Sequence, residues 1–143
     1  MATGTIRRYN HTLQRYGSGA NAAGNTYKLM LCSAATFNAA NTTLASITKT
    51  EISGNGSTTG GATLANVAVT TVTTNDAKFD ADDVSITASG GSIAASHAIL
   101  YNDTDADDPP VAFLNFDGTI TATDGVPFVV QWNANGIVTF TTA

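Results

Sequence analysis

The sequence IAASHAILY (residues 93–101) and the sequence VAFLNF (residues 111–116) decide the fold of this chain, because both are short, apolar and bounded by turn-forming residues. Between them lies NDTDADDPP, residues 102–110. This segment cannot continue a central strand, since neighbouring carboxylates repel one another and proline has no N–H to donate to a strand ladder. The pattern therefore predicts two buried strands joined by an acidic loop.

Length and composition predict one β-rich domain. A chain of 143 residues can bury a sizeable core but is too short for two ordinary domains. Hydrophobic residues make up 43% of the chain, which excludes wholesale disorder. Charged residues make up 12%, about half the usual share of roughly 25%. Thr, Ala, Gly, Asn and Ser fill the difference, as is typical of a β protein with many tight turns and a polar, mostly uncharged surface.

The charge is unevenly distributed along the chain. The net charge of −5 argues against nucleic acid and anionic membranes as partners, because both attract a basic surface. Four of the six basic residues lie in the first 28 positions, ahead of every acidic residue: Arg7, Arg8, Arg15 and Lys28. The N-terminal segment could therefore bind an acidic partner through Arg7, Arg8 and Arg15, or it could be a solvated terminus; both interpretations stay open.

Cys32 is the only cysteine, so no disulfide forms within the chain. It lies in the apolar run YKLMLC, residues 27–32, where a small buried hydrophobe is expected rather than a nucleophile. The sequence has no signal-peptide pattern and no apolar run near 18 residues, the length of a membrane-spanning helix. We therefore expect a protein made in the cytoplasm.

Residues 5–16 form the only helix that the sequence predicts. An apolar stripe recurs there at helical spacing, and Gly17 ends it: Ile6, Tyr9, Leu13 and Tyr16. We expect an N-terminal arm and short helix over residues 1–25, followed by a β-sandwich domain over residues 26–143.

The rest of the chain predicts short strands separated by turns. The expected strands span residues 26–33, 63–74, 78–80, 84–87, 92–101, 111–116, 119–123, 127–132 and 137–141. Turns are expected at Asn75-Asp76, Asp117-Gly118 and Asp124-Gly125, and a hairpin turn at residues 133–136. Closely spaced short strands predict an all-β fold, a single-domain antiparallel β-sandwich or jelly-roll-like barrel with one short N-terminal helix.

The acidic loop is the stronger of two candidate metal sites; the weaker is the group Asp80, Asp82 and Asp83. Asp103, Asp105 and Asp107 alternate in a way that could aim carboxylates at a hard cation such as Ca²⁺. The loop lacks the glycine and the terminal bidentate glutamate of a helix-loop-helix calcium site. The favoured interpretation is a solvated acidic loop that blocks pairing at a sheet edge, with no metal bound.

No combination of residues indicates catalysis or a cofactor. His11 and His97 are far apart in the sequence, and each is expected to be structural rather than part of a triad or a zinc site. Glu51 is the only glutamate, with no second carboxylate near it. Exposed Trp132 or Tyr101 could stack on a sugar, which would make the chain a carbohydrate-binding module, but aromatic residues on strands more often belong to the core.

Seven segments in order resemble a group of small virion proteins of tailed bacteriophages. They cover nearly the whole chain: TGTIRRYNHTLQRYG, TYKLMLCSA, EISGNGSTTGGATLANV, AKFDADDVSI, HAILYNDT, PVAFLNFDG and PFVVQWNANGIVTF. The order of the segments carries the resemblance, and no single segment is diagnostic. LNFDG stands here where IDFG is common in that group.

The resemblance implies a non-enzymatic structural protein of the virion. The favoured role is a capsid decoration or cement protein on the head exterior; a neck or tail component is the alternative. The implied partners are the major capsid protein and other copies of the chain, in many copies per virion and as a homotrimer. The group has no catalytic residues to compare.

Overall fold

The computed structural model describes residues 4–73 and 76–141, and within them the fold is all-β. Strands make up 47% of the chain and helix 7%, and the paired strands are antiparallel. One short α-helix, α1 (Thr12–Gly17), lies near the N-terminus, and a 3-10 turn covers Leu44–Ser46. The predicted all-β sandwich with one short N-terminal helix is confirmed. Among the described residues, no helix is long and apolar enough to cross a membrane.

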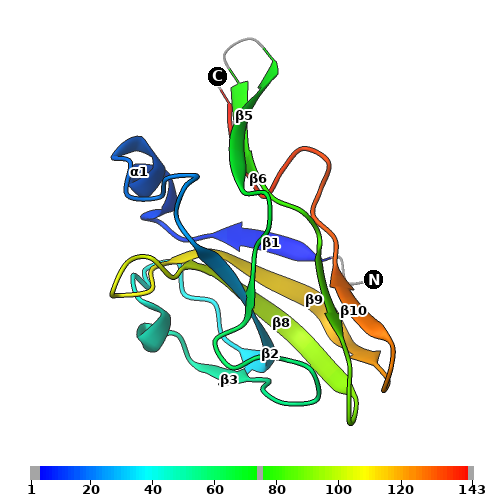
Figure 1. The fold of residues 1–143 in the computed structure, drawn as a ribbon. Coiled ribbons are helices and arrows are strands. Elements are labelled where there is room, and N and C mark those ends of the chain that lie inside the picture. The colour runs from blue at the N-terminus through cyan, green and yellow to red at the C-terminus, as the bar shows by residue number, and fades with distance from the viewer. Residues whose placement is uncertain (1–3, 74–75, 142–143) are drawn as a thin grey trace.

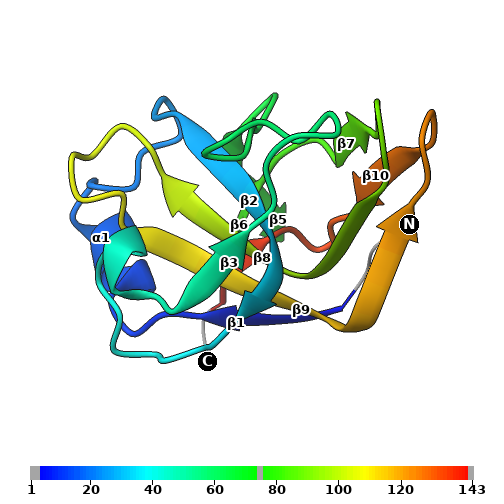
Figure 2. The same ribbon diagram turned by 90° about the horizontal axis from the view of Figure 1, so that it is seen from below.

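The larger layer is a six-stranded sheet in the order β1-β9-β8-β2-β3, with β4 also paired to β2. Its strands are β1 (Thr5–Arg8), β2 (Tyr27–Ala35), β3 (Lys49–Glu51), β4 (Ala62–Thr63), β8 (Ile93–Asn102) and β9 (Pro110–Ala122). The two apolar runs that the sequence singled out are its central pair, with Ile99 opposite Phe113. Figure 2 shows β1 running along β9 at the edge of this sheet.

The second layer consists of two smaller sheets. One pairs β7 (Val84–Thr87) with β10 (Pro127–Val130), and the other has the order β11-β6-β5. Its strands are β5 (Ala68–Thr73), β6 (Asp76–Asp80) and β11 (Val138–Phe140). The β5–β6 hairpin extends beyond the edge of the larger sheet (Figure 1).

Both faces of the larger sheet are covered, which explains its continuous apolar strands. On one face, Leu29 and Leu100 pack with Phe79 of the second layer in the main core. On the other face, Met30 and Ile99 pack under Leu44 in a smaller cluster. Alternate residues of one strand therefore enter two different apolar clusters, and no polar face remains to interrupt the pattern.

The predicted helix over residues 5–16 is wrong in its first half. Residues 5–8 form β1, and only residues 12–17 are helical. The backbone groups at the edge of β9 need hydrogen-bonding partners, and β1 supplies them. The two strands pair antiparallel, with Thr5 opposite Asn115 and Arg8 opposite Ala112. The apolar stripe is split between clusters, because Ile6 packs on the main core and Tyr9 in the smaller one.

The predicted turn at Asp117-Gly118 is also wrong. Both residues have positive φ, 58° and 145°, but β9 continues through them as a bulge. The pairing moves from His97 opposite Asn115 to Ala95 opposite Ile120, so the extra residues loop out of the ladder.

The other predicted turns have mixed outcomes. The turn at residues 133–136 is present, with Gly136 N–H donating to Asn133 O, but it does not join a hairpin, because β10 pairs with β7 and β11 with β6. The turn at Asp124-Gly125 is confirmed. At Asn75-Asp76, Asn75 lies outside the described residues and Asp76 begins β6.

Candidate functional site

Basic residues hold two carboxylates of the acidic loop. Lys28 Nζ lies 2.9 Å from Asp103 Oδ2, and Arg15 Nη2 lies 2.8 Å from Asp105 Oδ2. The hydrogen bond from Arg15 lowers the pKa of Asp105 below its usual value. The side chain of Asp107 is exposed, and its backbone N–H donates to Asp105 Oδ1. The loop is therefore tied to α1 and β2 through ion pairs.

This arrangement gives no support to a metal site. Within residues 4–73 and 76–141, no three acidic, histidine or cysteine side chains are grouped so that they could hold a metal ion. Asp103 and Asp105 each face a different cation of the chain itself. That the loop binds no metal stays a prediction.

The three arginines proposed to bind a partner differ in their surroundings. Arg15 is committed within the chain, because its guanidinium binds both Asp105 and Asn21 and its side chain is 18% exposed. Arg7 is exposed, and its guanidinium lies over the Phe37 ring at 5.5 Å. Arg8 is exposed on the same strand and makes one long contact, from Nη1 to Thr139 O at 3.4 Å. Only Arg7 and Arg8 of the three are therefore available to a partner.

The histidines and the cysteine occupy structural positions. His11 Nε2 donates to Pro110 O at 3.0 Å, and His97 Nδ1 lies 2.7 Å from Ser96 Oγ. Ser96 Oγ donates its hydrogen to Ser33 O, so His97 must donate from Nδ1. Cys32 is fully buried, and burial raises its pKa to about 12, which leaves the thiol protonated and unreactive at neutral pH.

The aromatic residues proposed to stack on sugars are buried. Trp132 is 7% exposed and donates from Nε1 to Asp82 O, while Tyr101 is 2% exposed and donates to Gly60 O. Both side chains are almost fully buried, so neither offers the broad exposed ring face on which a carbohydrate stacks.

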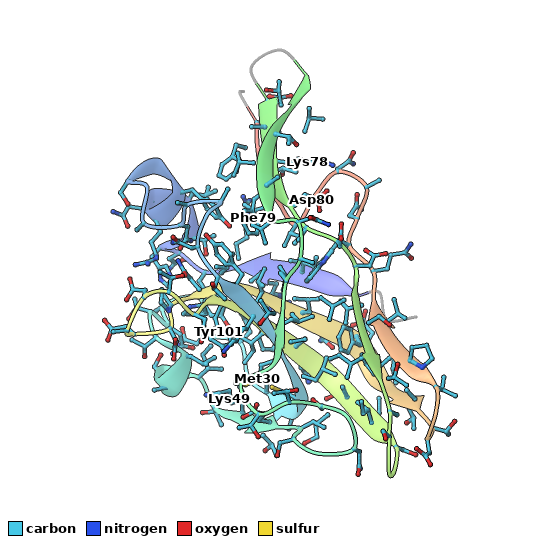
Figure 3. All side chains as sticks on the ribbon, viewed as in Figure 1. Met30, Lys49, Lys78, Phe79, Asp80 and Tyr101 are labelled. Atoms are coloured by element: carbon cyan, nitrogen blue, oxygen red, sulfur yellow. The ribbon has the colours of Figure 1, made fainter. Side chains whose placement is uncertain are left out.

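Glu51 has a role that the sequence did not reveal. Its carboxylate accepts a hydrogen bond from the backbone N–H of Gly60. The Tyr101 hydroxyl donates to the backbone O of the same glycine. These two bonds close the glycine-rich loop over residues 54–61 against β3 and β8. Tyr101 belongs to the same smaller apolar cluster as Met30, and both are labelled in Figure 3. A search for a second carboxylate could not have found this role, because the partner is a backbone amide.

A cavity of about 510 Å³ lies between the two layers at one edge of the sandwich. We call it the edge cleft. Gly4 and the β1 residues Ile6 and Arg8 line one side, while most of the other side comes from residues 131–139. No signal in the sequence pairs these segments, because they come from opposite ends of the chain.

An apolar surface lies at the protruding hairpin. Leu13 of α1 is 47% exposed, and Val69 and Val72 of β5 are each 46% exposed. Leu13 and Val69 also line an apolar groove of about 500 Å³ between α1 and the hairpin, with Phe140 in its wall. We call Leu13, Val69 and Val72 the hairpin patch. On the other face of the hairpin, Lys78 pairs with Asp80 at 2.9 Å (Figure 3).

Comparisons of the chain with protein-family models, with curated proteins and with solved structures found no match. Any function proposed for this chain therefore rests on its residues and their geometry.

Proposed function

We propose that this chain is a non-enzymatic structural protein of a tailed-phage virion, and that it decorates the exterior of the capsid in many copies. The observation that carries the proposal is the hairpin patch. Three of the four large hydrophobic side chains that are exposed among the described residues belong to α1 and β5: Leu13, Val69 and Val72. Two of them, Leu13 and Val69, line one groove. Apolar side chains left exposed together on a protruding element are typical of a contact surface between proteins.

The second support is the placement of basic charge. Arg7 and Arg8 lie on the edge strand β1, and neither forms an ion pair with any described residue, while the whole chain carries a net charge of −5. An acidic region of the major capsid protein would complement this edge. The order of sequence segments that resembles small virion proteins agrees with both observations. The homotrimer stays a prediction.

Binding to purified capsids of the encoding phage tests this function. We expect the wild-type protein to sediment with capsids. The double variant Arg7→Glu/Arg8→Glu should bind at least about tenfold more weakly, because its new carboxylates would face the acidic region of the major capsid protein. Deletion of residues 1–8 is less informative, because it would remove β1 and uncover the edge of β9.

A matched control reverses charge away from β1. Lys28 lies on β2, where it forms an ion pair with Asp103. The variant Lys28→Glu should retain capsid binding in any sample that stays folded. Absence of wild-type protein from the capsid pellet would contradict decoration. Its recovery with tails instead would favour a neck or tail component.

A further inference from the structure

Two sheet edges with unused backbone groups border the edge cleft. β1 ends the larger sheet and β11 ends the β11-β6-β5 sheet, so in the described residues each pairs on one side only. Residues of both strands line the cleft, and Arg8 Nη1 donates a long hydrogen bond across it to Thr139 O at 3.4 Å. An edge strand offers a row of backbone N–H and C=O groups, which an extended peptide recognises by adding a strand.

The side chains of the edge cleft define the charge of that peptide. No described residue that lines it is acidic, and Arg8 is its only charged group. The carboxamides of Gln131 and Asn135 also line it, and neither side chain has a hydrogen-bonding partner among the described residues. Ile6 and Ile137 add apolar contacts. A ligand that satisfies this set is an extended chain with backbone polar groups, small apolar side chains and one carboxylate.

We infer that the edge cleft binds an extended segment of a partner chain, with a carboxylate of that segment on Arg8. The inference rests on the proposed function, under which the segment belongs to the major capsid protein. Alternation along β1 separates two surfaces. Gly4, Ile6 and Arg8 line the cleft, whereas Thr5 and Arg7 line a different hollow on the opposite face of the strand, beside Phe37.

This alternation supplies a matched pair of variants on one strand. Arg8→Ala removes the cation of the cleft, while Arg7→Ala removes an equal charge from the other face. The probe is the blocked peptide acetyl-Val-Thr-Val-Asp-Val-Thr-amide, compared with the same peptide carrying Asn in place of Asp. Binding is followed by NMR titration of the ¹⁵N-labelled full chain, which identifies the amides that contact the peptide.

We expect the Asp peptide to shift amides of residues 5–8 and 136–139 and to bind about tenfold more tightly than the Asn peptide, as a desolvated ion pair would allow. Arg8→Ala should remove that preference, and Arg7→Ala should keep most of it. High salt should weaken only the Asp peptide. Equal binding of the two peptides, absence of binding, or shifts confined to the other free edge at β5 would overturn the inference.

Parallel capsid binding separates this inference from the proposed function. Wild-type binding to capsids that survives Arg8→Ala, together with no peptide preference, would reject the cleft and leave decoration standing. Peptide binding at the cleft without any capsid binding would reject decoration and leave the cleft standing. Self-association that Arg8→Ala abolishes would assign the cleft to a second copy and overturn the capsid segment as its occupant.

Discussion

Glu51 illustrates how one charged side chain can stabilise a loop. Its carboxylate accepts the Gly60 N–H, a bond to a charged acceptor that a neutral side chain cannot fully replace. We predict that Glu51→Ala lowers the free energy of unfolding by about 1–2 kcal/mol, because the Gly60 amide loses its acceptor. Glu51→Gln should lose less, since the amide oxygen can still accept.

Urea denaturation measures both variants against Thr50→Ala. Thr50 is exposed on the same strand, and no described residue bonds its side chain, so its loss should leave the unfolding free energy nearly unchanged. An effect of Glu51→Ala no larger than that of Thr50→Ala would show that the loop closes without the carboxylate.

His11 makes stability depend on pH. Burial, together with the charge of Arg15, holds its pKa below the usual 6.5, although the hydrogen bond to Pro110 O opposes the shift. The folded state then binds fewer protons than the unfolded state, so His11 stabilises fully above about pH 6.5 and less as the pH falls below that value.

We predict that the melting temperature falls less between about pH 7 and about pH 5 in His11→Gln than in the wild type, because glutamine cannot titrate in this range. Its amide can still donate to Pro110 O. The wild type and His11→Gln have the same carboxylates. The difference between their slopes of melting temperature against pH is therefore due to His11. Identical slopes would rule out a shifted pKa at position 11.

At the scale of elements, the contact between the glycine-rich loop and β2 depends on the absence of one side chain. A Cβ on Gly61 would collide with the backbone of Leu29 and Met30, whereas on Gly60 it would meet only the Tyr101 hydroxyl at 3.6 Å. Both glycines have positive φ, 96° and 89°, so alanine is strained at either position.

We predict that Gly60→Ala costs about 1–2 kcal/mol of unfolding free energy from backbone strain alone. Gly61→Ala should cost about 1–3 kcal/mol more, because the loop must move away from β2. Thermal and urea unfolding of the two variants give the difference. Equal costs would show that β2 accommodates the added methyl group.

The strands differ in how far the sequence predicts them, and the reason is burial. β8 and the first part of β9 were predicted, because both of their faces enter apolar clusters and the apolar run is continuous. β1 was not, because TIRR has no strand pattern of its own. Residues 5–8 form a strand because they pair with the edge of β9. Tertiary context here overrides the local conformational preference of the sequence.

At the scale of the whole molecule, the sequence predicted the sandwich but not its surfaces. Arg7 and Arg8 were identified as partner candidates from charge distribution alone, and the structure places them on opposite faces of one edge strand. The edge cleft and the hairpin patch each combine segments that lie far apart in the chain. Patterns in a single sequence describe residues that are close along the chain, and they do not show which distant segments pack together.

Under the function that we propose, copies of this chain cover a phage head. The most direct measurement is quantitative mass spectrometry of purified virions separated into heads and tails, with the major capsid protein as the internal standard. We expect the chain in the head fraction in many copies, at a constant ratio to the major capsid protein. Its absence from virions, or its recovery from tails at a few copies per particle, would contradict capsid decoration.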